Sequence, residues 1–145
     1  MSIARETYYA ALFAVLQSLQ SGGTVQICDR RVRFLNEMGA AELPALFMAV
    51  DRQQLTQRRG QPARHQLGAR LFLYAANPDR HTAAGIALNG LLDALESALA
   101  PPVGAEVQTL GGLVSHAWIE GPIEVFEAPQ GERSAAIVTV QMLVP

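Results

Sequence analysis

The sequence predicts an α+β domain, in which a mostly antiparallel β-sheet has two amphipathic helices packed on one face. Two stretches, near residues 2–21 and 83–99, repeat apolar residues at the three- and four-residue spacing of helices. The stretches between and after them contain runs that alternate apolar and polar residues, as half-buried strands do. The order of helix, strands, helix and strands is typical of a sheet with its helices on one side.

The first predicted helix carries an apolar stripe and has a signal at each end. Ser2 is a candidate N-cap, and Gly22-Gly23 marks the stop. A one-sided apolar stripe is typical of a helix that lies on a core. The members of the stripe are Tyr9, Leu12, Phe13, Leu16 and Leu19.

Two strands are predicted next. Val32 and Phe34 alternate with arginine over residues 31–34, which is the period of a half-buried strand. Pro44 then precedes an apolar run at residues 45–50 that suits a central strand. Proline is tolerated at the first position of a strand, so Pro44 agrees with this interpretation.

Residues 51–64 form the most polar stretch of the chain, and Gly60 and Pro62 interrupt it. A connection of this length without secondary structure of its own is uncommon in a compact domain and is often functional or flexible. We therefore expect a flexible polar arm at about residues 51–64, between two paired strands. The next strand, residues 65–76, is apolar on both faces at its far end, which predicts cover on both faces.

The second half of the chain is predicted to contain one helix and then strands. The helix has a leucine stripe over about residues 83–99, and Pro101-Pro102 ends it. The predicted strands and the turn before the last of them are residues 107–110, 113–126, Pro129-Gln130-Gly131 and 134–144. We expect one domain over residues 1–145, which is long enough to bury a core without disulfides or metals.

The composition favours a domain that another molecule partly covers. Half of the residues are hydrophobic and 17% are charged, against about 25% charged in typical domains. We infer apolar surface that a second copy or another protein covers, with an alanine-rich monomer as the alternative. The apolar run at residues 8–16 is too short to span a membrane, and Glu6 makes it a poor signal peptide, so we expect a soluble protein.

Charge and cysteine usage narrow the functional classes. The net charge is −2 and every basic residue is an arginine, so the basic excess of a nucleic-acid binder is lacking. Arginine is favoured at protein interfaces, although a GC-rich genome produces the same usage. The single Cys28 leaves no partner for an internal disulfide, and we expect a buried, unreactive thiol.

The sequence contains no constellation that predicts catalysis. His65, His81 and His116 are scattered, without the spacing that lets two histidines share a metal. Glu120 and Glu124 lie four residues apart on a predicted strand, about 13 Å, whereas glycosidase carboxylates lie roughly 5 to 9.5 Å apart. We expect a solvated or subunit-contacting acidic stripe, no enzyme activity, no metal and no cofactor.

The basic residues concentrate in the polar arm, where Arg58 and Arg59 are flanked by Arg52 and Arg64. Three interpretations stay open. The arm is a solvated loop, or it orders against an acidic surface of a neighbouring protein, or it contacts DNA phosphates.

Several stretches, taken in order, cover nearly the whole chain and resemble one known family. The most specific runs from Val107 to Gly121 and contains Thr109-Leu110-Gly111-Gly112 and Trp118-Ile119-Glu120-Gly121. The others are residues 4–13, 44–47, 57–60, 91–101 and 143–145, and the match is weakest in the charged loop and at residues 29–32. Together they are similar to the tail terminator proteins (tail completion, minor tail protein U-like) of long-tailed bacteriophages and prophages.

The resemblance implies an α+β subunit that forms a hexameric ring on the last ring of the tail tube. Such a ring stops tube polymerisation and offers its other face to the head-tail connector protein. It implies three partners, namely identical subunits, the tail tube protein and the connector, with DNA passing through the lumen without sequence-specific binding and with no membrane. The expected location is the head-proximal end of the virion tail, after assembly in the host cytoplasm.

Two sets of residues are predicted to form interfaces. Trp118 and Glu120 are assigned to the ring interface, with a core position as the alternative for Trp118. Contact with a subunit or with the tube is assigned to Gln57, Arg58, Arg59 and Gly60. The alternative functions are another neck or tube-type phage structural protein, or a small oligomeric enzyme or ligand-binding domain with a site between subunits.

Overall fold

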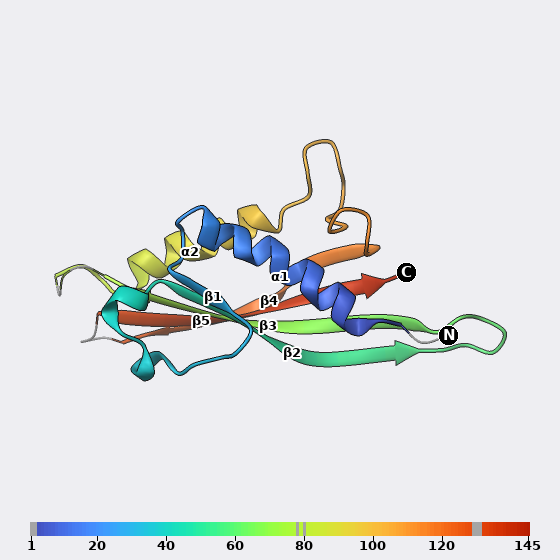
Figure 1. The fold of residues 1–145 in the computed structure, drawn as a ribbon, viewed down its shortest axis with the longest axis horizontal. Coiled ribbons are helices and arrows are strands. Elements are labelled where there is room, and N and C mark those ends of the chain that lie inside the picture. The colour runs from blue at the N-terminus through green and yellow to red at the C-terminus, as the bar shows by residue number, and fades with distance from the viewer. Residues whose placement is uncertain (1–2, 78, 80, 129–131) are drawn as a thin grey trace.

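Two α-helices, two 3₁₀ turns and five strands form the part of the chain that the structure describes, residues 3–77, 79, 81–128 and 132–145. The structure is a computed structural model (Figure 1). The elements are α1 (Arg5–Ser21), β1 (Ile27–Asp29), η1 (Leu35–Glu37), η2 (Ala40–Glu42), β2 (Ala45–Thr56), β3 (Arg64–Ala76), α2 (Gly85–Ala98), β4 (His116–Glu127) and β5 (Arg133–Val144).

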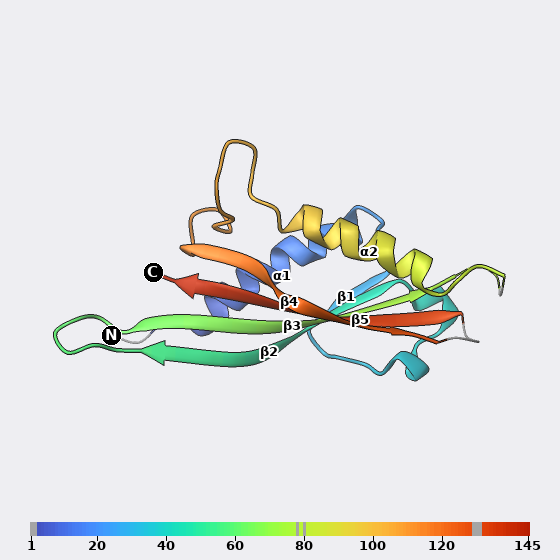
Figure 2. The ribbon, with the colours of Figure 1, turned by 180° about the vertical axis from the view of Figure 1, so that it is seen from behind.

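The strands form one sheet in the order β1-β2-β3-β5-β4. The β1–β2 pair is parallel and the other pairs are antiparallel. Figures 1 and 2 show both helices on the same face of this sheet. The predicted class, an α+β domain with a mostly antiparallel sheet and two helices on one face, is therefore confirmed.

The first helix buries the predicted stripe and ends where predicted. Gly22 N–H donates to the Ser18 carbonyl at 2.9 Å, and Gly23 adopts a φ of 83°, which suits glycine. The helix begins later than predicted, with Ala4 at its N-cap position, and Ser2 lies outside the described residues. Phe13 is half-buried, and the fully covered members of the stripe are Tyr9, Leu12, Leu16 and Leu19.

The strand predicted at residues 31–34 is wrong, and the first strand is β1 instead. Residues 31–34 lie outside the sheet, where the Phe34 side chain is 72% exposed. Arg33 in this segment pairs with Glu42 at 2.7 Å, and its carbonyl accepts a hydrogen bond from the Tyr74 hydroxyl at 2.7 Å. Side-chain contacts, rather than strand pairing, therefore hold this segment against the sheet.

The sheet has apolar cover on both faces at one end only. The main core lies between the helices and the sheet. On the other face, which we call the helix-free face, the segment of residues 31–44 covers a second, smaller cluster. This arrangement provides the two-sided cover predicted for the far end of residues 65–76. The buried members of the smaller cluster are Met38, Leu43, Ala45, Phe47 and Tyr74.

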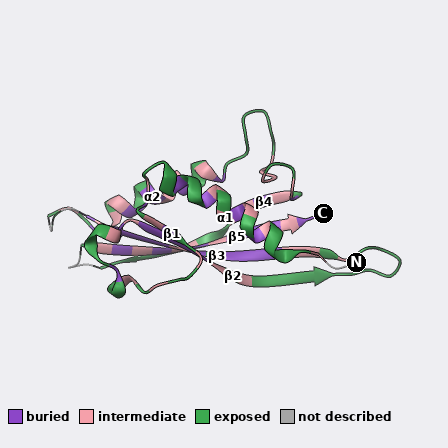
Figure 3. Cartoon of the chain, in the orientation of Figure 1, coloured by how far each residue is buried: buried purple, intermediate pink, exposed green. Residues whose placement is uncertain are grey.

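The polar arm is shorter than predicted. Residues 51–56 continue β2 and Arg64 already begins β3, so the connecting loop spans only residues 57–63. The register shifts between Val50 and Gln53, which marks a β-bulge. Figure 3 shows the second half of β2 exposed. Its polar composition reflects exposure of a paired strand, because polar side chains there face water while the backbone is hydrogen-bonded to β3.

The second half of the chain agrees with the prediction except at one strand. The buried stripe of α2 includes Leu88, Leu91 and Leu95, and β4 and β5 lie close to their predicted positions. The strand predicted at residues 107–110 is wrong, since only Gln108 forms an isolated bridge, to Ala117. Turns replace that strand because positive φ angles occur at Leu110, Gly111 and Gly112. The predicted turn at Pro129-Gln130-Gly131 lies outside the described residues.

Candidate interaction surface

The helix-free face carries side chains from four neighbouring strands, arranged in rows. Alternate residues of each strand point to this face, and residues paired in register lie side by side. Away from the end that residues 31–44 cover, the rows are polar. Reading from β2 to β4, they are Gln54, Gln66, Leu143 and His116; Gly68, Gln141 and Trp118; and Ala49, Arg70, Thr139 and Glu120.

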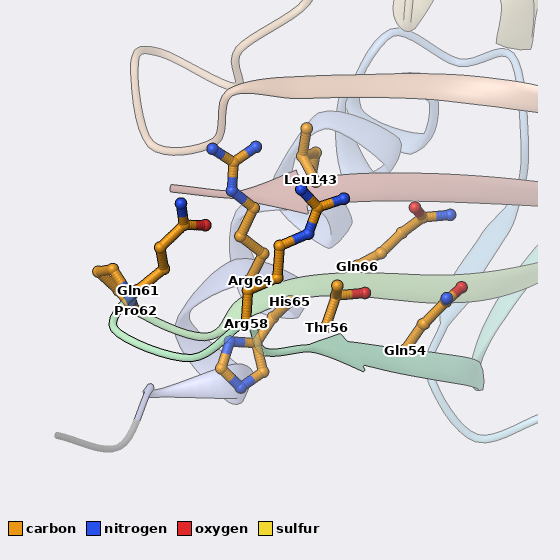
Figure 4. Close-up of a pocket in the computed structure, with 9 residues that line it drawn as sticks. All are labelled: Gln54, Thr56, Arg58, Gln61, Pro62, Arg64, His65, Gln66 and Leu143. Carbon is orange, nitrogen blue, oxygen red and sulfur yellow. The ribbon is translucent and has the colours of Figure 1, made fainter.

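The β2–β3 hairpin carries the basic residues at the open end of this face. We call residues 51–64 the arginine hairpin. A shallow hollow of about 420 Å³ lies against its loop end and is lined by Arg58, Arg64, Gln54 and Gln66 among others. Figure 4 shows the guanidinium groups of Arg58 and Arg64 on the same side of the hairpin, directed toward the end of β5 at Leu143. Guanidinium and amide groups placed in this way suit a carboxylate or phosphate.

The arginine hairpin is not neutralised within its own subunit. It contains four arginines and one aspartate, hence a net charge of +3, in a chain whose net charge is −2. Asp51 pairs with Arg70 at 3.4 Å. Among the described residues, no carboxylate lies within 4.0 Å of the guanidinium groups of the hairpin arginines. These groups are Arg52, Arg58, Arg59 and Arg64.

Hydrogen bonds fix the base of the hairpin to the first turns of α1. Arg5 Nε donates to Gln53 Oε1 at 2.8 Å, and Gln53 Nε2 donates to the Tyr9 hydroxyl at 3.1 Å. The Tyr9 hydroxyl donates in turn to the Gly68 carbonyl at 2.8 Å, and burial raises the pKa of Tyr9. This chain of bonds ties the point where β2 bulges to the helix that covers β3.

Trp118 and Glu120 lie on the helix-free face of β4. Trp118 is half-buried and outside both core clusters, and its ring contacts the ring of His116 with centroids 4.6 Å apart. Glu120 is exposed and accepts a hydrogen bond from Gln141 Nε2 at 3.0 Å. Gln141 also accepts one from Gln66 Nε2 at 3.3 Å, so polar side chains connect β3 to β4 across the face.

The structure does not bring the two predicted sets together. Gln57, Arg58, Arg59 and Gly60 lie in the hairpin loop, whereas Trp118 lies two strands away and in the row of Gly68. From Arg64 the separation is about 13 Å along the strand and about 10 Å across the sheet. A partner that binds both sets must therefore be a large surface.

The acidic stripe predicted at Glu120 and Glu124 belongs to a longer acidic region of the chain. Residues 81–132 contain seven acidic residues and no lysine or arginine. The second half of β4, residues 120–127, contains three of these acids, and we call it the acidic strand. Two of its apolar residues are also exposed, Val125 by 51% and Phe126 by 55%. Counting charges along the chain would have found this segregation, but only the fold shows that the acids lie on the edge strand opposite β2.

The described residues offer few groups for chemistry. None of them forms a group of three His, Cys, Asp or Glu side chains placed to hold a metal ion. Burial raises the pKa of the Cys28 thiol to about 11, so at neutral pH the thiol is protonated and a poor nucleophile. In the described part of the chain, no helix is both long enough and apolar enough to cross a membrane.

Comparison with known protein families and with curated proteins gives no match for this chain. The fold is an α+β domain in which the arginine hairpin and the acidic strand lie on different strands of one open sheet. The functional assignment therefore rests on this surface and on the resemblance of the sequence segments described above.

Proposed function

We propose that the chain is a structural subunit of a bacteriophage tail, which assembles into a hexameric ring and caps the tail tube. The ring stops polymerisation of the tube and provides the surface for head-tail joining. The observation that carries this proposal is the arginine hairpin, a charged extension with no carboxylate partner among the described residues of its own subunit. The segments that resemble tail terminators, above all Val107–Gly121, are the reason for proposing a ring that caps the tail tube.

The proposed mechanism is geometric. A ring with six-fold symmetry is built from one heterologous contact that repeats until it closes. One side of the ring mimics a tube subunit and binds the last ring of the tail tube protein. The opposite side lacks the surface that adds another tube ring, so growth stops there and the head-tail connector binds instead. DNA passes through the lumen without sequence-specific contacts.

Two features of the surface support an assembled state. The acidic strand exposes Val125 and Phe126 beside its carboxylates, and exposed apolar area with a polar rim is typical of an interaction site. Figure 1 shows that the hairpin extends past the start of α1 at one end of the molecule. A projecting strand pair of this kind reaches a neighbour without disturbing the core of its own subunit.

The native mass tests the proposal. Light scattering over a range of protein concentrations, with and without assembled tail tubes, is expected to give the mass of a hexamer, and negative-stain microscopy is expected to show closed rings. A phage that lacks the gene is expected to make overlong tails without heads. Long fibres formed by the pure protein would instead assign it to the tube-type structural proteins. A strict monomer, even with tubes present, would contradict the proposal.

A further inference from the structure

We infer that the arginine hairpin of one copy binds the acidic strand of the next copy. This inference rests on the proposed function, because it names the two surfaces that form the contact between ring subunits. It goes further because it names the residues on each side of the contact and places the two surfaces at different positions on the same subunit.

The two surfaces lie on different strands of the sheet, and the acidic strand runs from Glu120, in the row of Arg70, to Glu127 at the end far from the hairpin loop. The hairpin loop ends at Arg64, the first residue of β3, whereas Glu127 pairs with Ser134, which pairs with Ala75 near the other end of β3. Eleven residues of extended strand separate Arg64 from Ala75, about 36 Å. One subunit can therefore engage two neighbours at once, and contacts between unlike surfaces are the kind that close into rings.

The charges of the two surfaces are complementary. The hairpin has a net charge of +3, and the acidic strand contains three acids and no lysine or arginine, hence a net charge of −3. Glu124 has no hydrogen-bond partner among the described residues and Glu120 has one, from Gln141, so both keep free acceptor sites. Arginine forks bind carboxylates through paired, charge-assisted hydrogen bonds, which add direction to the attraction.

A second copy of the chain neutralises the charges of both surfaces, whereas DNA neutralises only those of the hairpin. DNA phosphates would neutralise the hairpin arginines but would leave the acidic strand facing solvent or a like charge. In the described residues, the other arginines near acids are already paired, as Arg30 is with Glu6 and Arg33 with Glu42. The hairpin is therefore the basic surface that this chain offers to the acidic strand of a neighbour.

The contact is made by side chains rather than by strand addition. The register of β4 shifts between Glu120 and Glu124, and Pro122 within this bulge has no N–H to donate. A bulge and a proline on an edge strand both oppose pairing with another strand. Phe126 shares the helix-free face with Glu124 and adds exposed apolar area beside the charges.

Charge reversal on each surface, followed by mixing, tests the inference. One variant carries Arg58→Glu and Arg59→Glu, and the other carries Glu120→Arg and Glu124→Arg. In each variant alone, hairpin and strand have the same sign, so we expect the mass to fall about sixfold, from ring to monomer. In an equimolar mixture every contact again joins opposite charges, so we expect rings of alternating composition, measured by native mass spectrometry. A control, Asp93→Arg with Glu96→Arg, reverses two exposed acids on α2 and should assemble as the wild type does.

The outcomes separate this contact from the proposed function. If the wild type forms rings and either reversed variant still assembles alone, the hairpin-strand contact is wrong and the ring proposal stands. The same conclusion holds if both variants are folded but do not assemble when they are mixed. Circular dichroism of each variant establishes that it is folded. If the hairpin variant forms normal rings but no longer binds a short DNA duplex that the wild type binds, the hairpin contacts DNA and the inference is overturned. A wild type that stays monomeric with tubes would overturn both.

Discussion

The two ends of the helix-free face differ in what covers them. At one end Phe47 and Tyr74 lie under residues 31–44, and Arg133 Nη1 donates hydrogen bonds to two carbonyl groups of that segment, at 2.9 and 2.8 Å. At the other end the same face presents glutamines, Trp118 and the arginine hairpin without cover from the described part of the chain. Residues 31–44 therefore cover one end of the face, and we interpret the uncovered end as a surface that binds a partner.

The largest expected effect comes from the closed end. Phe47→Ala removes a fully buried ring that contacts the ring of Tyr74, with centroids 5.6 Å apart. We expect the free energy of unfolding to fall by about 3–5 kcal/mol, because a cavity is left in a packed cluster. Urea unfolding followed by circular dichroism measures this change.

The matched control for Phe47 is Phe126, which lies on the same face but on the uncovered edge strand. Phe126→Ala should lower the free energy of unfolding by less than about 1 kcal/mol, because the ring is already more than half exposed. Equal losses at the two positions would contradict the distinction between a closed end and an open edge.

A second expected effect lies at the boundary between the two ends. A Cβ added at Gly68 would lie 2.5 Å from the Arg52 carbonyl oxygen, a backbone atom that moves only with β2. We expect Gly68→Ala to cost about 1–3 kcal/mol of stability, because the two strands must separate beside the bulge. Thermal unfolding measures this loss.

The control for Gly68→Ala is Gly90→Ala, which we expect to change the stability in the opposite direction. At Gly90, on the exposed side of α2, an added Cβ meets nothing within 4 Å. Gly90→Ala should therefore stabilise the protein, by about 0.5–1 kcal/mol, since alanine is the better helix former. A stable Gly68→Ala variant would show that the strands at the base of the hairpin are loosely held.

The sequence predicts the helices and the central strands well, because their apolar patterns are local and one-sided. It fails at residues 31–34, where the partners of Arg33, namely Glu42 and Tyr74, come from other parts of the chain. It also fails at residues 51–56, because polar composition there results from exposure and not from irregular backbone. Of the candidate surface, the arginines were visible in the sequence, whereas the position of the acidic strand depends on the strand order β1-β2-β3-β5-β4.

A smaller effect is expected at the bond that fixes the hairpin to α1. Tyr9→Phe leaves the aromatic packing in place and removes the hydroxyl that donates to the Gly68 carbonyl at 2.8 Å. We expect a loss of about 1 kcal/mol, the usual value for one buried hydrogen bond. Hydrogen exchange of the backbone amides of residues 49–56 should become faster while that of residues 45–47 stays unchanged. Faster exchange in both parts would mean that the two ends open together.

The smallest effect concerns Cys28, whose strand β1 borders the closed end by pairing with Ala45–Phe47 of β2. Burial raises the pKa of its thiol to about 11, whereas an exposed cysteine titrates at about 8.5. Between these two values the unfolded chain loses this proton first, so stability should fall as the pH rises through that range and Cys28→Ala should weaken the fall.

Iodoacetamide should modify the native thiol on the order of a hundredfold more slowly than the unfolded one near pH 8.5, since the thiolate is the reactive form. Phe47→Ala should speed this reaction and the charge-reversed hairpin variant should not; a fast reaction in the wild type would show that the closed end opens readily.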